Sequence, residues 1–305
     1  MRALLVVNPK ATTTTARARD VLAHALASEV KLDVVETTHR GHAIELAEQA
    51  TRDGIDVVVA LGGDGTVNEV VNGLLHEGPR PGLPALAVVP AGSTNVFARA
   101  LGLPNSALEA TGHLLQALLH DRRRAIGLGL ADERWFTFNA GLGVDAGAVR
   151  RVERARARGR TATQPLYMRS AVREFFVGPY RGHRITIARP GFEPVDVALA
   201  LVCNTDPWTY LGERPVRPCP DASFDSGLDV MGLTTAPTLP TLRHLAQILA
   251  KDGRPHGKRI VALHDVAEMT LSSPVPLPFQ LDGDDVGDRE HVVLRAVASA
   301  LEVIV

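Results

Sequence analysis

The residues best suited to chemistry in this chain form a glycine-rich turn, Gly62-Gly63-Asp64-Gly65-Thr66, between the apolar run 55–61 and a helical pattern that begins at Val67. Glycine admits backbone conformations that other residues avoid, and it leaves the amide groups open to a ligand. Amides at such a turn and at a helix start attract anions. Asp64 suits Mg²⁺ bridged to phosphate, or a nucleotide hydroxyl, better than bare phosphate. The turn therefore predicts a nucleotide polyphosphate site.

A second turn of the same kind strengthens this prediction. The run 85–90 leads into Gly92-Ser93-Thr94-Asn95 and then into another helical pattern. Each turn alone is compatible with an ordinary strand-to-helix connection. Polar residues at both strand ends favour one shared site, because open α/β sheets bind ligands at the carboxyl ends of their strands.

Phosphoryl transfer also needs a carboxylate that orients or deprotonates the acceptor hydroxyl. Asp282-Gly283-Asp284 places two acidic groups on either side of a glycine that allows close approach to a phosphate. A plain turn is the alternative, since aspartate and glycine are common turn residues. The turn 141–146 fits a dinucleotide pattern, but the acidic residue expected about 20 positions later is absent. We interpret it as a structural turn, with Asn139 near the substrate.

The elements that position these residues follow from the hydrophobic pattern. Residues 1–122 alternate short apolar runs with helical periods, which predicts a parallel α/β sheet that binds nucleotide at one edge. The strands are expected at 2–7, 31–36, 55–61 and 85–90, and the helices at 16–28, 41–52, 67–76, 94–101 and 106–120. Residues 123–295 predict a β-rich, sandwich-like second domain with helices at about 144–157, 165–176 and 238–250. Its strands are expected at 134–139, 183–188, 194–203, 227–233, 258–263 and 267–272, and the last strand-like runs are 291–295 and 300–305.

Five motifs, by their order and spacing, resemble the diacylglycerol kinase catalytic family, which includes bacterial lipid kinases and sphingosine kinases. They occupy residues 8–10, 62–66, 90–99, 139–145 and 280–284. The resemblance covers nearly the whole chain, and it implies an ATP- and Mg²⁺-dependent lipid kinase. It also suggests that the final segment, about 296–305, packs back on the first domain.

The resemblance implies roles for individual residues. Asn8, Pro9, Lys10 and Thr37 would join the nucleotide site, although Thr37 equally suits a helix N-cap. The four threonines at 12–15 replace a small, flexible turn of the family. Asp282 matches the first acid of the family's D-G-E motif, so we predict that it is the general base. Asp284 stands where the family has glutamate, and we predict that it is catalytic as well. Asp225 matches an acidic turn, which implies a magnesium ligand.

The predicted reaction is transfer of the γ-phosphoryl group from ATP to diacylglycerol, giving phosphatidic acid for phospholipid biosynthesis. A sphingoid-base or other lipid alcohol kinase would share every motif. An NAD kinase would share the 62–66 turn. A nucleotide- or lipid-binding regulator without turnover is favoured only by the aspartate at 284. Relatives in this family often self-associate, so a homo-oligomer stays open, and no Walker A or protein-kinase motif is present.

Composition sets the remaining expectations. The chain has 305 residues, 45% of them hydrophobic, which is enough to bury a sizeable core. Cys203 and Cys219 suggest reduced thiols, and no apolar stretch approaches the roughly 20 residues of a membrane span.

We expect a cytoplasmic protein that contacts the inner face of the cell membrane. The arginine-rich segment 150–160, followed by 171–176, suits anionic headgroups, although a solvated connector is an equal alternative. Nucleic-acid binding is not expected, since the patch has no interleaved aromatics.

Overall fold

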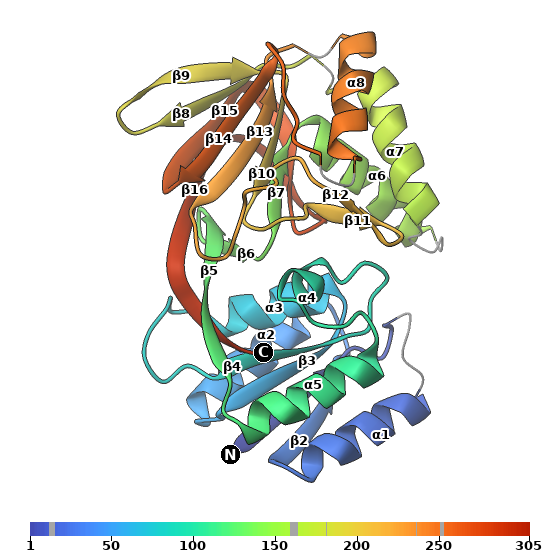
Figure 1. Ribbon diagram of the computed structural model, residues 1–305, viewed down its shortest axis with the longest axis vertical. Helices are drawn as coiled ribbons and strands as arrows, with labels where there is room; N and C mark the ends of the chain where they lie inside the picture. Colours follow the sequence, from blue (N-terminus) through green and yellow to red (C-terminus); the bar gives the residue numbers. More distant parts are fainter. Residues whose placement is uncertain (12–15, 159–163, 181, 236, 251–252) are drawn as a thin grey trace. The chain divides into compact units, whose positions relative to one another are not determined.

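A computed structural model describes residues 1–11, 16–158, 164–180, 182–235, 237–250 and 253–305 (Figure 1). The threonine run 12–15 and Arg160 therefore lie outside the described residues. The chain forms two compact units, the first made of Met1–Gly127 with Ser299–Val305, the second of Leu128–Ala298. The sequence placed the corresponding boundaries after 122 and after 295.

The first unit contains a parallel sheet in the order β16-β4-β3-β1-β2. Every residue of β3 and β4 is buried, as is typical of strands that are covered on both faces. The end of β16 joins this sheet, with Val303 opposite Leu86. The strands are β1 (Arg2–Val7), β2 (Lys31–Glu36), β3 (Val57–Gly62), β4 (Ala85–Pro90) and β16 (Asp284–Ile304).

Helices cover both faces of this sheet. Figure 1 shows α1 (Ala16–Ala27) and α5 (Ala107–Leu119) on one face, and α2 (His42–Arg52) and α3 (Asp64–Leu74) on the other. Leucines from α1 and α5, such as Leu26 and Leu114, pack on the apolar strand residues of this unit. The short α4 (Val96–Ala100) follows the second glycine turn. The parallel α/β part of the predicted fold class is confirmed.

Helix α3 begins three residues earlier than the sequence analysis placed it. Gly63 is its N-cap, and Asp64 is its first residue. The expected start at Val67 was wrong because the glycines were assigned to the turn, whereas Gly65 already lies in the first helical turn. Asp64 and Gly65 thus lie in the first turn of α3, where helix amides commonly lack carbonyl partners, whereas Thr66 N donates to Gly63 O at 3.0 Å.

The second unit is β-rich, as predicted, and its main sheet has the order β14-β13-β10-β7-β15-β16. The pairings among these strands are antiparallel. An apolar core that includes Leu142, Leu271 and Phe279 packs within this unit. Strand β5 (Arg123–Ala131) begins in the first unit and ends in the second. The other strands of the second unit are β6 (Arg134–Phe136), β7 (Asn139–Leu142), β8 (Ile185–Arg189), β9 (Phe192–Val197), β10 (Leu199–Cys203), β11 (Thr209–Leu211), β12 (Arg214–Val216), β13 (Leu228–Leu233), β14 (Ile260–Val266) and β15 (Glu268–Leu281).

Three helices accompany these strands: α6 (Val144–Ala157), α7 (Gln164–Val177) and α8 (Thr238–Ile248). The sequence analysis missed β5 and divided β16 into two runs, 291–295 and 300–305. Pairing with β15 keeps β16 extended through its mostly polar residues 284–290. The local hydrophobic pattern of β16 does not predict this pairing. Among the described residues, no helix has the length and apolar character that a membrane crossing requires.

Candidate active site

The predicted nucleotide residues of the first unit lie at one edge of its parallel sheet. Asn8 follows β1, Thr37 follows β2, and the two glycine turns follow β3 and β4. Backbone hydrogen bonds join neighbouring strand ends: Asn8 N donates to Leu61 O at 3.0 Å, and Thr37 N donates to Val7 O at 2.8 Å. These residues therefore share the carboxyl edge of the parallel sheet, which is the edge where open α/β sheets generally bind ligands.

The two glycine turns touch each other. Ala91 N donates to Gly62 O at 2.8 Å. A Cβ atom added at Gly92 would lie 2.7 Å from the Cα of Gly63 and 2.9 Å from Oδ1 of Asn95. Any side chain at position 92 would push the turns apart. Glycine is thus required here by close backbone approach, and the result is an edge lined by main-chain groups.

Asn8 links the first strand to the first turn. Its Nδ2 donates to Oγ1 of Thr66 at 3.1 Å, and its Oδ1 accepts from Lys10 N at 3.0 Å. Thr66 is buried, whereas Pro9 and Lys10 are exposed. The side chain of Asn8 thus holds the first turn, and Lys10 follows two residues later with its side chain exposed.

Asp64 caps the helix that follows the second turn. Its Oδ1 accepts from Phe97 N at 3.1 Å, in the first turn of α4. The N-cap residue of α4, Asn95, has a left-handed backbone (φ 50°) and makes no side-chain cap. Its amide group exchanges hydrogen bonds with Gly92 and also donates to Asn105. The structure therefore gives Asp64 and the buried Asn95 roles in shaping the turns, and it leaves Ser93 and Gly65 exposed.

Thr37 is not a helix N-cap, since Gly41 holds that position in α2. Glu69 of α3 instead caps this helix, its two carboxylate oxygens accepting from Gly41 N at 3.0 Å and from Ala43 N at 3.3 Å. The sequence analysis missed Glu69. A single acid in the middle of a helical pattern gives no local signal of a partner 28 residues away.

In the second unit, Asp282 and Gly283 form the tight turn between β15 and β16. Leu281 pairs with Asp284 across it, and φ is 50° at Asp282 and 81° at Gly283. Two positive φ values at an Asp-Gly pair are typical of a two-residue hairpin turn. The alternative interpretation, a plain turn, is thus correct for the backbone, and the side chain of Asp282 does more.

The Asp282 carboxylate is buried and accepts four hydrogen bonds. Oδ2 accepts from Thr137 N (2.7 Å) and from Thr137 Oγ1 (2.9 Å), and Oδ1 accepts from Phe138 N (2.9 Å) and Asn139 N (3.1 Å). A carboxylate has about four acceptor sites, so all of them are engaged. Burial raises the pKa of Asp282, while the four donors oppose this rise. Asp282 thus fixes the segment before β7.

A buried amide network lies beside this turn. Gln280 Nε2 donates to Asn139 Oδ1 at 2.9 Å and to Asp145 Oδ2 at 2.8 Å. Burial raises the pKa of Asp145 to about 6, and the hydrogen bond from Gln280 opposes this. A Cβ atom at Gly141 would lie 2.0 Å from Asp145 Oδ2. The turn 141–146 thus brings an acid toward the 280–284 motif, and the sequence analysis did not select Asp145.

Asp284 is the more accessible acid of its motif. Its side chain is 24% exposed and lies 3.8 Å from Nη2 of Arg134. The following acid, Asp285, makes a two-point ion pair with Arg150, with N–O distances of 2.6 and 2.9 Å. Arg150 Nη1 also lies 2.6 Å from Asp288. These contacts anchor the start of β16 to α6.

Asp225 is exposed, in the loop before β13. Asp229, four residues later, is buried, and its Oδ1 accepts from Asp265 N and contacts His264 Nδ1. Asp229 therefore has a structural role in joining β13 to β14. Among the described residues, no three His, Cys, Asp or Glu side chains gather as a metal cluster. Mg²⁺ usually takes few protein ligands and keeps several waters, so Asp64 and Asp225 fit it only as single-carboxylate ligands.

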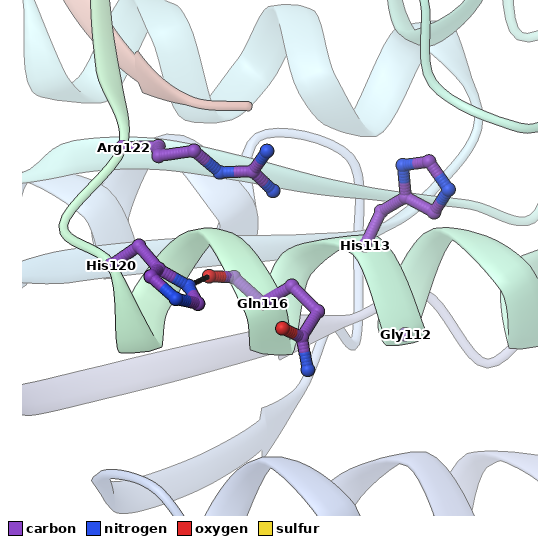
Figure 2. A pocket seen from close by; sticks show the side chains of 5 residues that line it. All are labelled: Gly112, His113, Gln116, His120 and Arg122. Carbon is purple, nitrogen blue, oxygen red and sulfur yellow. Dashed lines mark hydrogen bonds between the residues drawn. The ribbon is translucent and has the colours of Figure 1, made fainter.

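A separate hollow of about 620 Å³ lies on the first unit (Figure 2). It is lined by Gly112, His113, Gln116, His120 and Arg122, and Nδ1 of His120 contacts the backbone oxygen of Gln116 at 2.8 Å. No residue predicted for the active site lines it. All five residues are exposed.

Comparison with known proteins supports the resemblance. The family model described as the diacylglycerol kinase catalytic domain matches residues 2–129. A diacylglycerol kinase of Staphylococcus aureus (strain Newman) is 28% identical over 260 residues, which are 80% of this chain and 73% of that protein. The resemblance stated from the motifs is therefore confirmed.

Solved structures with this fold include a diacylglycerol kinase from Bacillus anthracis (strain Sterne), with a TM-score of 0.72, 19% identity, and coverage of 99% of this chain and 96% of that one. An NAD kinase from Archaeoglobus fulgidus in complex with ATP gives a TM-score of 0.54, 11% identity and coverage of 100% and 94%. At these identities the likeness shows the fold alone.

Proposed function

We propose that this lipid kinase transfers the γ-phosphoryl group of ATP to the hydroxyl of diacylglycerol, giving phosphatidic acid. The observation that carries the proposal is the meeting of the two glycine turns at the carboxyl edge of the parallel sheet, within the matched catalytic domain. A relative of this domain is named diacylglycerol kinase, which supports the choice of acceptor.

The first unit would hold the nucleotide. The amides at the start of α3 and the exposed residues of the second turn supply hydrogen-bond donors for phosphate oxygens. The cation of Lys10 would lie near the same phosphates. Asn8, Thr66 and Asn95 would position these groups through their hydrogen bonds within the turns. We propose that Thr37, at the end of the neighbouring strand, contacts the nucleotide.

The second unit would supply the groups that bind and deprotonate the acceptor hydroxyl. We propose Asp282 as the general base, with Asp284 beside it. In the structure, proton transfer to Asp282 requires one of its four donors to leave, and the Thr137 hydroxyl is the donor that leaves by side-chain rotation alone. The acceptor hydroxyl would take its place on Oδ2. A pKa raised by burial makes the carboxylate a stronger base than an ordinary aspartate.

Mg²⁺, when bound with ATP, neutralises charge on the phosphates. In the second unit, we propose Asp225 as a magnesium ligand. In the first unit, Asp64 is the carboxylate within the first glycine turn, and its Oδ1 accepts from Phe97 N. A lipid acceptor also implies peripheral contact with a membrane, which we propose at its cytoplasmic face.

Three alternatives to this function are considered. A sphingoid-base or other lipid alcohol kinase would use the same site. An NAD kinase is favoured by the shared 62–66 turn and by the similar fold. A binding protein without turnover would bind ATP and transfer nothing.

A labelled-phosphate assay tests the proposal. The chain would be incubated with γ-labelled ATP, Mg²⁺ and each of diacylglycerol, monoacylglycerol, sphingosine, ceramide and NAD. We expect label in diacylglycerol, and loss of that label in the Gly92→Ala variant. Label in sphingosine or NAD alone would replace the proposed acceptor. ATP binding without label in any acceptor would favour the binding protein.

A further inference from the structure

Helix α7 presents an unusual combination of side chains to solvent. Arg169, Val172, Arg173 and Phe176 are spaced three and four residues apart, so they share one face of the helix. All four are exposed, and Val177 after them is 72% exposed. We name these five residues the α7 stripe. The outer face of a helix is normally polar, so its large apolar residues require an explanation.

The opposite side of α7 accounts for how the helix packs. Ser170 and Glu174 are buried, and Glu174 Oε2 lies 2.6 Å from Nη2 of Arg151 on α6. Glu174 is the only acid in the sequence of α7. Its charge is thus directed into the protein, and the α7 stripe carries two arginines with no acid on the same helix face.

The structure also decides which arginines of the segment 150–160 are available. Arg150 is held by Asp285 and Asp288, and Arg151 by Glu174. Arg154, Arg156 and Arg158 are exposed near the end of α6. The helices α6 and α7 pack against each other, and they are consecutive in the chain. The first part of the predicted basic segment is therefore structural, and the α7 stripe is the part with both charge and apolar area.

We propose that the α7 stripe docks the protein on an anionic bilayer. Val172, Phe176 and Val177 would enter the boundary between headgroups and acyl chains, and Arg169 and Arg173 would pair with lipid phosphates, as basic amphipathic helices do at interfaces. Charge complementarity selects this partner. A second copy docked through the same stripe would bring four arginines together without an acid. The inference deepens the proposed lipid kinase function.

Vesicle flotation of the full chain, without ATP, tests the proposal. Vesicles of phosphatidylcholine alone are compared with vesicles that also contain phosphatidylglycerol. One variant removes charge (R169Q with R173Q), and the other removes apolar area (V172S with F176S). The matched controls alter exposed residues elsewhere: Arg214→Gln with Arg259→Gln for charge, and Leu108→Ser with Leu119→Ser for apolar area, these leucines being 69% and 56% exposed.

We expect the charge variant to bind anionic vesicles about 30-fold more weakly, since each arginine near such a surface contributes about 1 kcal/mol and 1.36 kcal/mol corresponds to about tenfold. The apolar variant should lose roughly tenfold or more on both vesicles. High salt should weaken wild-type binding. Wild-type-like binding by both variants, equal losses in the controls, or no binding of the wild type would overturn the proposal.

The same variants separate this inference from the proposed reaction. Transfer of phosphate to a short-chain, water-soluble diacylglycerol should be unchanged in both variants, because the α7 stripe contributes no residue to the proposed chemistry. Vesicle binding without phosphoryl transfer to any acceptor would leave the docking surface standing and remove the kinase proposal. The charge variant should keep the wild-type melting temperature, since exposed substitutions seldom change stability by more than about 0.5 kcal/mol. Phe176 is 36% exposed and its ring meets Phe175 edge-on, so the melting temperature of the apolar variant is measured first and its vesicle binding is assayed well below that temperature.

Discussion

Replacing Asp282 by asparagine removes the proposed base and also disturbs four hydrogen bonds. The asparagine Oδ1 can replace the oxygen that accepts from Phe138 N and Asn139 N. Its Nδ2 then faces Thr137, whose hydroxyl can rotate to accept, but whose backbone N–H loses its acceptor. One buried donor without a partner costs about 1–3 kcal/mol, and the two remaining bonds lose their charge. We expect a loss of about 2–4 kcal/mol in the free energy of unfolding.

Activity and stability therefore have to be measured together. Urea denaturation gives the loss of stability, and the labelled-phosphate assay, run well below the unfolding midpoint, gives turnover. A general base contributes roughly 10²- to 10⁴-fold, so we expect a fall of that size in the folded variant. Turnover within threefold of wild type would remove Asp282 from the role of base.

The stability readout tests the hydrogen bonds independently. Unchanged stability in the asparagine variant would refute the arrangement in which all four acceptor sites are engaged. The matched control is Thr137→Val, which has a similar shape and removes only the hydroxyl donor. It should cost about 1–2 kcal/mol and keep turnover, because the acceptor is proposed to displace that hydroxyl.

Three further predictions concern Asp145, Gly92 and Arg150. Asp145, whose pKa is raised to about 6, binds a proton more readily in the folded state than in the unfolded chain. The free energy of unfolding should therefore fall by up to about 3 kcal/mol as pH rises from about 4 to above 6. In urea titrations, Asp145→Asn should make the free energy of unfolding depend less on pH over this range. Gly92→Ala would place a Cβ atom 2.7 Å from Gly63 Cα. ATP binding, measured by calorimetry, should weaken at least about tenfold, because the backbone amides of the two glycine turns lose their alignment. Wild-type affinity would contradict the proposal that both turns bind the nucleotide. Arg150→Gln should lower the free energy of unfolding by about 2–4 kcal/mol, because it leaves Asp285 partly buried without its cation; a denaturation midpoint equal to wild type would show that the pair is dispensable.

Local patterns were enough to predict most elements of the first unit. The observed bounds of β1, β2 and β4 match the predicted runs, because short apolar strands between helical periods specify a parallel sheet. The glycine turns were also predictable, since close backbone approach leaves only glycine at such positions. The start of α3 was not, because Asp64, Gly65 and Thr66 suit a loop as well as a helix.

The second unit was harder to predict. Its β-rich character follows from the many short apolar runs, but β5 and the full length of β16 depend on partners far away in the sequence. Strand β16 stays extended through polar residues because β15 pairs with it. Alternation of apolar and polar residues indicates which face of a strand is buried, but it does not identify the strand that pairs with it.

The sequence by itself predicted the two glycine turns at one sheet edge and the family resemblance, since the turns and strands that form this edge are each continuous in the chain. Only the tertiary structure decided what the acids do. Asp282 meets donors about 140 positions away, Asp285 meets Arg150, and Asp64 meets Phe97 on another helix. A buried carboxylate must find donors wherever the strand register brings them. Those partners are fixed by packing, and no spacing in the sequence encodes them.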